Sequence, residues 1–341
     1  MKICYISFNL QGQGTYWRAF HFGRILAGLG HEVTILCTSP TSRLGVVERM
    51  DSGVRVVQTP DLFHGPLRSG WDPWNVLNRI GWLRNRRFDI VHAYEARPTV
   101  IYPALSLRQR NVPLFMDWCD WFGKGGSVEM RHNSLVRAVL RPVETYFEEH
   151  YRALSVGTTV ICSTLRDKVM GLGIPIENIL LARNGVRLDL FRTVENSPVR
   201  ARLGLEPGDY VIGYLGSAFP EDARLMWRAL EQVSGRLPGA RLLLLNYRTP
   251  GKDPFETSSD SVRCVNERNE TRMAELLSAC DLFWLPLSDC GANWGRFPIK
   301  LGIYLAMAKP VVCTSVGDVA GIIEQWSAGR VCAPNPVAFA A

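Results

Sequence analysis

The start of the chain alternates between strand and helix patterns, and this alternation constrains the fold more than any other feature. Lys2–Phe8 is a short apolar run with β-branched residues, which predicts a buried strand. A glycine turn follows at Gly12–Gly14, and apolar side chains then recur at helical spacing along Trp17–Leu29. Gly30 ends this predicted helix, and Val33–Cys37 predicts a second buried strand. A strand, a helix and a second strand form a βαβ unit, so we expect a parallel sheet with right-handed crossovers.

Strand and helix patterns continue to alternate along the chain, with one interruption at residues 192–209. This segment is polar, contains Pro198 and Pro207 and has no strand pattern. We therefore predict a linker there, between an N-terminal domain of residues 1–191 and a C-terminal domain of residues 210–341. The predicted fold class is α/β, with two doubly wound Rossmann-like domains facing each other across a cleft. Such sheets bind ligands at the carboxyl ends of their strands, where helix N-termini present free N–H groups.

The composition is that of an ordinary globular protein with a preference for anionic partners. Of 341 residues, 47% are hydrophobic and 21% are charged, which argues against extensive disorder. No apolar run approaches the ~20 residues that span a bilayer, and we see no secretory leader. The nine cysteines show no CxxC or paired-histidine spacing, which indicates reduced thiols in a cytoplasmic protein. The net charge of +7 favours phosphates, nucleotides or acidic lipids, and no motif for nucleic-acid binding accompanies it.

Five sequence motifs follow one another in an order that is specific when they are taken together. They are Gly12-x-Gly14 with Gly30–Val33, Asn184–Val186 followed by Phe191, Gly213–Gly216, Ala279–Pro286, and Arg296–Val312. In this order they resemble the motifs of retaining GT-B glycosyltransferases, particularly those of glycosyltransferase family 4.

The resemblance implies transfer of a sugar from a nucleotide-diphosphate sugar to an acceptor, with retention of the anomeric configuration. In this hexosyltransferase-type reaction the N-terminal domain holds the acceptor, which is a sugar, a lipid-linked molecule or another small molecule. The C-terminal domain holds the nucleotide-sugar, which is a co-substrate; no cofactor is implied. No Asp-x-Asp pair occurs, so we expect no metal requirement. Two alternatives remain open, namely a non-catalytic GT-B binding or partner protein and another GT-B enzyme such as a sugar-nucleotide epimerase.

Several positions depart from the family pattern. The two basic residues that hold the diphosphate in the family fall on Ser217 and Asp222, and the ribose-binding glutamate falls on Ile303. Arg296 and Lys300 lie four residues apart on one predicted helix face, and we expect them to supply the missing positive charge. The alternatives are that donor binding is altered or lost, and that Lys300 is an ordinary surface residue.

The candidate site residues fall into three groups, and none is a predicted metal ligand. The catalytic candidates are Asp117, Arg296 and Lys300. The donor-binding candidates are Gly12, Gly14, Gly216, Ser217, Arg296, Lys300 and Tyr304. The acceptor-binding candidates are Arg18, His21, His92, Glu95, Asp120 and Trp121.

These choices have chemical reasons, and each has a simpler alternative. Gly12 and Gly14 let the backbone approach a phosphate or a sugar, although a tight turn without a ligand needs the same residues. Carboxylates such as Asp117 and Asp120 accept hydrogen bonds from hydroxyls, and Trp121 can stack on the C–H face of a sugar. The alternative for Asp117 is a turn cap beside packed tryptophans.

Three further segments carry expectations. His64–Arg87 mixes three tryptophans with five arginines. This mixture fits peripheral contact with an anionic membrane at its inner face, or a solvated helix whose tryptophans pack on the domain. Asn133–Leu154 predicts a long helix. Residues 335–341 predict a helix that is just beginning, so the C-terminal helix of the family is expected to be missing.

Overall fold

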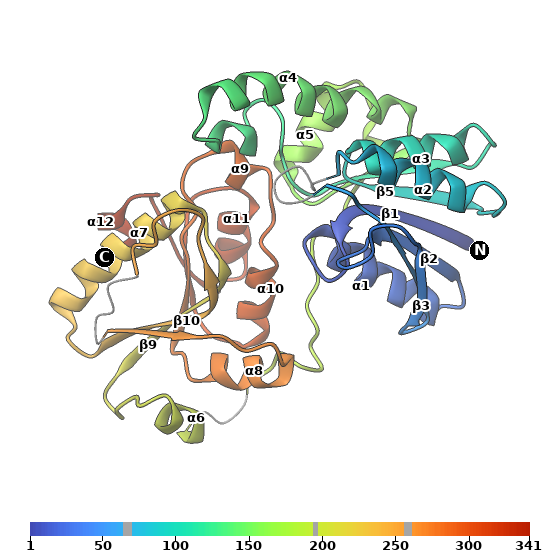
Figure 1. The fold of residues 1–341 in the computed structure, drawn as a ribbon. Helices are drawn as coiled ribbons and strands as arrows, with labels where there is room; N and C mark the ends of the chain where they lie inside the picture. The colour runs from blue at the N-terminus through green and yellow to red at the C-terminus, as the bar shows by residue number, and fades with distance from the viewer. Residues whose placement is uncertain (64–69, 194–196, 256–260) are drawn as a thin grey trace. The chain divides into compact units, whose positions relative to one another are not determined.

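The computed structural model describes residues 1–63, 70–193, 197–255 and 261–341. These residues form two compact units, Met1–Arg183 and Asn184–Ala341. Each unit is a Rossmann-like α/β domain on a mainly parallel sheet, which confirms the predicted fold class (Figure 1). The boundary between the units lies before residue 191, where the sequence analysis ended the N-terminal domain. The segment expected to be a linker belongs to the second unit, and it contains the short helix α6 (Ser197–Arg202).

The described strands of the first unit form one sheet in the order β3-β4-β2-β1-β5-β6-β7-β8. β3 pairs with β4 in antiparallel orientation, and the other neighbouring strands are parallel. The strands are β1 (Lys2–Leu10), β2 (Glu32–Thr38), β3 (Val47–Asp51), β4 (Val54–Thr59), β5 (Ile90–Tyr94), β6 (Leu114–Trp118), β7 (Gly157–Val160) and β8 (Ile179–Leu181). The helices are α1 (Thr15–Gly28), α2 (Pro73–Leu83), α3 (Pro98–Arg108), α4 (Ser134–His150) and α5 (Ser163–Gly171).

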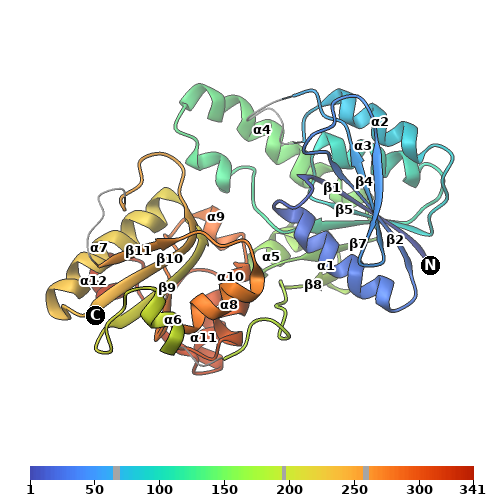
Figure 2. The ribbon, with the colours of Figure 1, turned by 60° about the horizontal axis from the view of Figure 1, so that its bottom comes forward.

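Helices cover both faces of this sheet, as Figure 2 shows. α1 packs on one face, where Tyr16 and Phe20 join Ile35 of β2 in an apolar core. α2 and α3 pack on the other face, where Leu83 and Val100 join a second core. Burial of these side chains from water is the main stabilising term for such a layer.

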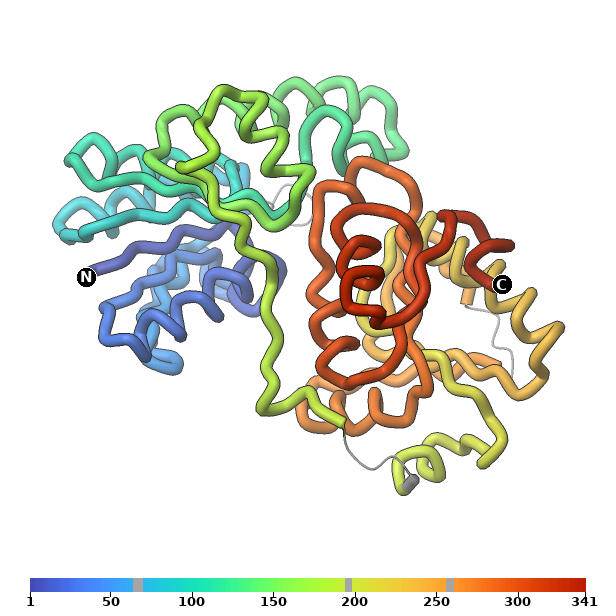
Figure 3. The backbone as a smooth tube through the Cα atoms, turned by 180° about the vertical axis from the view of Figure 1, so that it is seen from behind, coloured from blue at the N-terminus to red at the C-terminus, as the bar shows by residue number. Residues whose placement is uncertain are grey.

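The second unit repeats this plan. Its described strands are all parallel, in the order β11-β10-β9-β12-β13-β14. In Figure 3, α10 and α11 lie on one face of the sheet, and α7 lies with α12 on the other. The strands are β9 (Tyr210–Ser217), β10 (Ala240–Arg248), β11 (Val262–Val265), β12 (Leu282–Leu285), β13 (Val311–Thr314) and β14 (Gly329–Cys332). The helices after α6 are α7 (Pro220–Arg236), α8 (Glu270–Ser278), α9 (Gly291–Trp294), α10 (Ile299–Ala306), α11 (Asp318–Gln325) and α12 (Pro336–Ala340).

The strand order of each sheet marks where a ligand would bind. β1 lies between β2 and β5, and β9 lies between β10 and β12, so the direction of the chain crossovers reverses beside each of these strands. Ligands of open α/β sheets bind at the carboxyl ends of strands at such a switch point. The turns after β1 and β9 are therefore the places to examine in each unit.

Two expectations about helices are confirmed. The long helix predicted for Asn133–Leu154 is α4, capped by the Asn133 side chain and followed by a short 3-10 turn at Arg152–Leu154. The helix predicted near the end of the sequence is α12, whose first residue is Pro336. Throughout the described part of the chain, no helix has both the length and the apolar character that crossing a bilayer requires.

Candidate active site

The glycine turn after β1 is tight, and its glycines are there for conformational reasons. Gly12 and Gly14 have φ values of 80° and 51°, a region that residues with a Cβ rarely adopt. A Cβ on Gly14 would also lie 2.7 Å from the amide nitrogen of Asn9. The Asn9 side chain accepts the Thr15 N–H at 3.0 Å and so helps to start α1. The conformation of the turn alone explains both glycines, so their contact with a ligand remains a prediction.

Asp117, at the end of β6, is fully buried in an ion pair with Arg18 of α1. The guanidinium of Arg18 donates to both carboxylate oxygens at 2.9 Å, and the Thr159 hydroxyl donates to one of them. Burial opposes ionisation, but Arg18 holds the pKa of Asp117 below its usual value. Arg18 also donates to the carbonyl of Ala182 at 2.7 Å. Two predicted site residues, Arg18 and Asp117, therefore lie in contact, and the charge of each is paired with that of the other.

The two predicted histidines differ in their surroundings. His92 of β5 is within 3.1 Å of the Thr159 hydroxyl, and burial lowers its pKa to about 4, so it is neutral at physiological pH. His21 of α1 is half-buried and stacks on Trp17, with ring centroids 5.8 Å apart. The Trp17 indole donates to the carbonyl of Gly12 at 2.8 Å, which places His21 beside the glycine turn.

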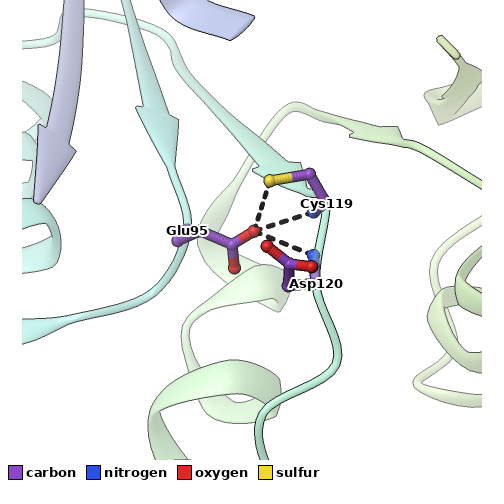
Figure 4. A group of neighbouring side chains, drawn as sticks. All are labelled: Glu95, Cys119 and Asp120. Carbon is purple, nitrogen blue, oxygen red and sulfur yellow. Dashed lines mark hydrogen bonds between the residues drawn. The ribbon is translucent and has the colours of Figure 1, made fainter. Parts of the chain in front are cut away.

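Glu95 follows β5 and forms a compact cluster with Cys119 and Asp120, shown in Figure 4. One oxygen of its buried carboxylate accepts the backbone N–H groups of Cys119 at 2.8 Å and Asp120 at 3.1 Å. The same oxygen accepts the Cys119 thiol at 2.7 Å. The other oxygen has no hydrogen-bond partner among the described residues. Burial, assisted by the charge of Asp120, raises the pKa of Glu95 to about 8, and its φ of 69° is unusual for a non-glycine residue.

The ligand types in this cluster raise the question of a metal ion. One potential ligand atom from each of Glu95, Cys119 and Asp120 lies within 4.8 Å of the others. The Glu95 oxygen in the cluster, however, already faces two N–H groups and a thiol, whose positive ends would repel a cation. Burial also raises the pKa of Cys119 well above its usual value, which disfavours the thiolate that a metal would bind. The arrangement suits hydrogen bonding better than metal coordination.

The loop after β6 holds Trp121 and is anchored by Glu148 of α4, which the sequence analysis did not single out. Glu148 accepts the Trp118 indole N–H at 3.2 Å and the backbone N–H groups of Phe122 and Gly123 at 2.5 and 2.6 Å. Burial raises its pKa to about 7. Trp121 is half-buried, with the Lys168 ammonium 4.3 Å from its ring centroid. The only sequence signal for Glu148 was its place on a predicted helix.

In the second unit, Lys300 of α10 lies at the end of β9. Its ammonium donates to the Tyr214 hydroxyl at 2.7 Å and to the Ser217 carbonyl at 2.9 Å. The side chain of Lys300 is half-buried. This burial, together with the nearby Arg296, holds the pKa of Lys300 well below its usual value. Among the described residues Lys300 makes no salt bridge, so its partners are uncharged.

Arg296 lies in the loop before α10, so it does not share a helix face with Lys300 as the spacing predicted, and it is bound to a carboxylate. It donates to Asp222, in the first turn of α7, at 3.0 Å, and its guanidinium stacks over the Phe219 ring. Asp222 is fully buried and also accepts the backbone N–H and hydroxyl of Ser288, both at 2.7 Å, and the Asn293 amide at 2.9 Å. The positive charge that we expected Arg296 to offer is therefore largely balanced within the protein.

The remaining donor candidates surround Lys300. Gly216 has a φ of 75°, which allows the turn at the end of β9, and Ser217 offers its carbonyl to Lys300. Tyr304 is fully buried, stacks on Phe283 with centroids 4.2 Å apart, and accepts the Leu215 N–H at 2.8 Å. Tyr304 thus has no exposed surface and supports the end of β9 from behind.

The tryptophan and arginine segment His64–Arg87 is described only from residue 70, so residues 64–69 lie outside the described part. Trp82 is buried and donates to Glu48 at 2.6 Å, and Trp74 donates to the Arg43 carbonyl at 3.2 Å. Trp71 packs edge-on against Phe147. The three tryptophans of the segment therefore pack on their own unit, which agrees with the interpretation of a solvated helix whose tryptophans pack on the domain.

Each of the two units matches the model of a known protein family. The model of the glycosyl transferase 4-like domain matches residues 12–185, and that of glycosyl transferases group 1 matches residues 209–341. Among curated proteins, D-inositol 3-phosphate glycosyltransferase of Segniliparus rotundus is 26% identical over 165 residues. That match covers 43% of this chain and 36% of the relative, so the chain aligns with only about a third of the relative's length.

Solved structures match over almost the whole chain. Sucrose-phosphate synthase of Thermosynechococcus elongatus superposes with a TM-score of 0.72 and 16% identity, over 99% of this chain and 87% of that one. Anabaena Alr3699/HepE, solved in complex with UDP, superposes with a TM-score of 0.66 and 15% identity, over 100% and 88%. At these identities the likeness establishes the fold, which is the GT-B fold that the sequence predicts.

Proposed function

Since the chain belongs to the glycosyl transferase family, with a glycosyl transferase 4-like domain followed by a group 1 domain, we propose that it transfers a sugar from a nucleotide-diphosphate sugar to an acceptor. The observation that carries the proposal is the position of Lys300, whose ammonium lies at the end of β9 and is held only by uncharged oxygens. A bound phosphate would favour the charged form of this amine, whose pKa burial and Arg296 lower, and would accept a charge-assisted hydrogen bond from it. The switch point beside β9 is where the fold binds ligands.

We assign Lys300 the main part in holding the diphosphate and Arg296 a smaller one. Because Asp222 compensates Arg296, the pair offers about one net positive charge where the family usually has two basic residues. Lys300 stabilises the charge that develops on the leaving diphosphate. Retention of configuration and independence of metal are part of the proposal; the lack of an Asp-x-Asp pair in the sequence supports the second.

For the acceptor we propose the residues at the carboxyl ends of β5 and β6. The half-buried ring of Trp121 and the neighbouring carboxylate of Asp120 suit a hydroxyl-bearing molecule such as a sugar, and the buried Glu95 holds the Asp120 backbone in place. Asp117 and Arg18 bind one another, so we give them the role of positioning residues behind this site.

The experiment that tests the function is acceptor-dependent release of nucleoside diphosphate. UDP is the first nucleotide to test, because one structural neighbour was solved with it. A panel of nucleotide-sugars is screened by thermal shift, since a ligand at 100 times its Kd adds about 2.7 kcal/mol to stability. Release is then measured with acceptor and with EDTA present and absent. Donor binding without any release of nucleoside diphosphate would favour the alternative of a non-catalytic binding protein. The pairing of Arg296 with Asp222 is the observation that motivates this alternative.

The first prediction concerns Lys300. Lys300→Ala should weaken UDP binding by about 1.5–3 kcal/mol, the usual contribution of a charged hydrogen bond. Lys300→Gln, which keeps a hydrogen-bond donor but not the charge, should show most of the same loss. Lys309→Ala is the matched control, because Lys309 lies in the same unit just before the amino end of β13, whereas Lys300 lies at the carboxyl end of β9. Calorimetric titration measures all four proteins, and equal Kd values for them would refute the assignment.

We also propose that the protein works at the surface of an anionic membrane. The excess charge supports this, because it lies entirely in the first unit. Residues 1–183 contain 22 Lys and Arg against 15 Asp and Glu, whereas residues 184–341 contain 17 of each kind. A basic residue near an acidic bilayer contributes about 1 kcal/mol to binding.

A further inference from the structure

The helix α4 is amphipathic, and its orientation on the first unit is the reverse of the usual one. A surface helix normally buries its apolar stripe and exposes its charged face. In α4 the apolar residues are exposed: Leu135 by 77%, Val139 by 66% and Tyr146 by 49%. These positions, with the exposed Val143, recur at intervals of three or four residues and so share one face. The helix lies at the periphery of the unit in Figures 1 and 2.

The inward face of α4 is acidic and firmly bound, which fixes the orientation. Glu144 is buried and accepts hydrogen bonds from Arg97 and Arg131, both at 3.0 Å. Glu148 is buried one turn later and accepts the Trp118 indole N–H of β6 and two backbone N–H groups of the loop that follows. A rotation of α4 that buried the apolar stripe would expose these partners and leave Arg97 unpaired among aromatic rings. The outward stripe is therefore built into the fold.

An exposed apolar stripe on a regular helix calls for something that covers it. The distribution of charge points to an anionic lipid surface, because the unit that carries α4 holds the whole positive excess of the chain. A helix with one apolar face on a basic body suits binding in the plane of the interface, with the apolar side chains below the headgroups. Tyr146 and Tyr102, both exposed and at one end of the stripe, suit the headgroup level, where tyrosine is common.

We propose that the apolar face of α4, formed by Leu135, Val139, Val143 and Tyr146, inserts shallowly into an anionic membrane. The proposal rests on the membrane part of the proposed function and is independent of the transfer reaction. It places the contact on α4, whereas the sequence had pointed to the segment 64–87, of which residues 64–69 lie outside the described part and whose tryptophans pack on the protein. Insertion of this face would bring the acceptor side of the chain to the membrane surface, because α4 anchors the loop that holds Trp121.

The test is co-sedimentation of the full chain with vesicles of phosphatidylglycerol and phosphatidylcholine, and of phosphatidylcholine alone, at low and at high salt. We expect the wild-type protein to bind the anionic vesicles and to keep part of that binding at high salt, because apolar insertion is not screened. The variant Leu135→Gln with Val139→Gln should bind at least tenfold more weakly and should lose the salt-resistant part. Both side chains are exposed, so its melting temperature should stay unchanged.

A matched control is available in the same unit. Leu44 and Leu180 are exposed by 78% and 63%, so Leu44→Gln with Leu180→Gln removes similar apolar surface elsewhere. This control should bind vesicles like the wild type. If the wild type and the α4 variant bind equally, the assignment to α4 is wrong while membrane contact stands. If the wild type binds no vesicles, both are wrong, and nucleoside diphosphate release still tests the transfer reaction separately. A wild-type dimer that the α4 variant dissociates, without vesicle binding, would show that a second copy covers the stripe.

Discussion

At the scale of single residues, the ion pair of Asp117 and Arg18 decides how the first-unit site is held together. Both side chains are buried and bound to each other twice. Breaking a buried pair leaves an uncompensated charge, which costs about 3–5 kcal/mol. Asp117→Asn should therefore lower the melting temperature strongly. Asp167→Asn, at an exposed pair with Arg166, is the control and should change it little.

The pH dependence of Asp117 follows from the same contacts. Its pKa is lower in the folded protein than in the unfolded chain, so the unfolded state binds the proton more tightly. Its contribution to stability is therefore present above the unfolded pKa of about 3.9 and is lost as the pH falls through the folded pKa. Thermal unfolding between pH 2.5 and 6 should show a steeper loss for the wild type than for Asp117→Asn. Parallel curves, or an unchanged melting temperature of the variant, would show that the pair is not an important source of stability.

At the scale of elements, Glu148 connects α4 to the loop after β6. Its carboxylate accepts three N–H groups, and Gln can accept with only one oxygen. Glu148→Gln should cost about 1–3 kcal/mol, because one N–H group of the loop loses its partner. We expect faster amide exchange in residues 119–131, with the second unit unchanged. Glu149→Gln, one position along the helix and half-exposed, is the control.

The same side chain should give the stability a pH dependence of the opposite sign. Burial raises the pKa of Glu148 to about 7, above its value in the unfolded chain. The folded state then binds the proton more tightly, so this contribution is complete below the unfolded pKa and is lost as the pH rises through about 7. Because His92 and Glu95 also titrate in this range, the readout is the difference in stability between the wild type and Glu148→Gln in denaturant titrations from pH 5 to pH 8. The wild type should lose stability relative to the variant as the pH rises, and a constant difference would contradict the assignment.

At the scale of the whole molecule, the sequence predicted the architecture better than the contacts within it. Strand and helix patterns are local, so the two Rossmann-like units and the helices α4 and α12 could be predicted from neighbouring residues. The pairing of Asp222 with Arg296 could not, because it joins residues 74 positions apart in the chain, one in α7 and the other in the loop before α10. Tyr304 and Trp82 look like ligand or surface residues until the packing shows that they are buried. The exposed apolar stripe of α4 could not be predicted either, because a sequence pattern gives the period of a helix but not which of its faces is buried.

The last prediction concerns how the two units share the binding of a nucleotide. The chain contains separate apolar cores in residues 1–183 and 184–341, and Gly216, Ser217 and Lys300 all lie in the second unit. A ligand stabilises the part of the protein that binds it, so UDP should slow amide exchange first at the end of β9 and in α10. Exchange in the sheet of the first unit should stay as it is without ligand. Uridine at the same concentration is the control, because it lacks the phosphates that we propose Lys300 to bind, and it should protect much less. Hydrogen exchange with mass spectrometry measures both units in one experiment. Protection confined to the first unit, or equal protection by UDP and uridine, would show that the nucleotide is not held through Lys300.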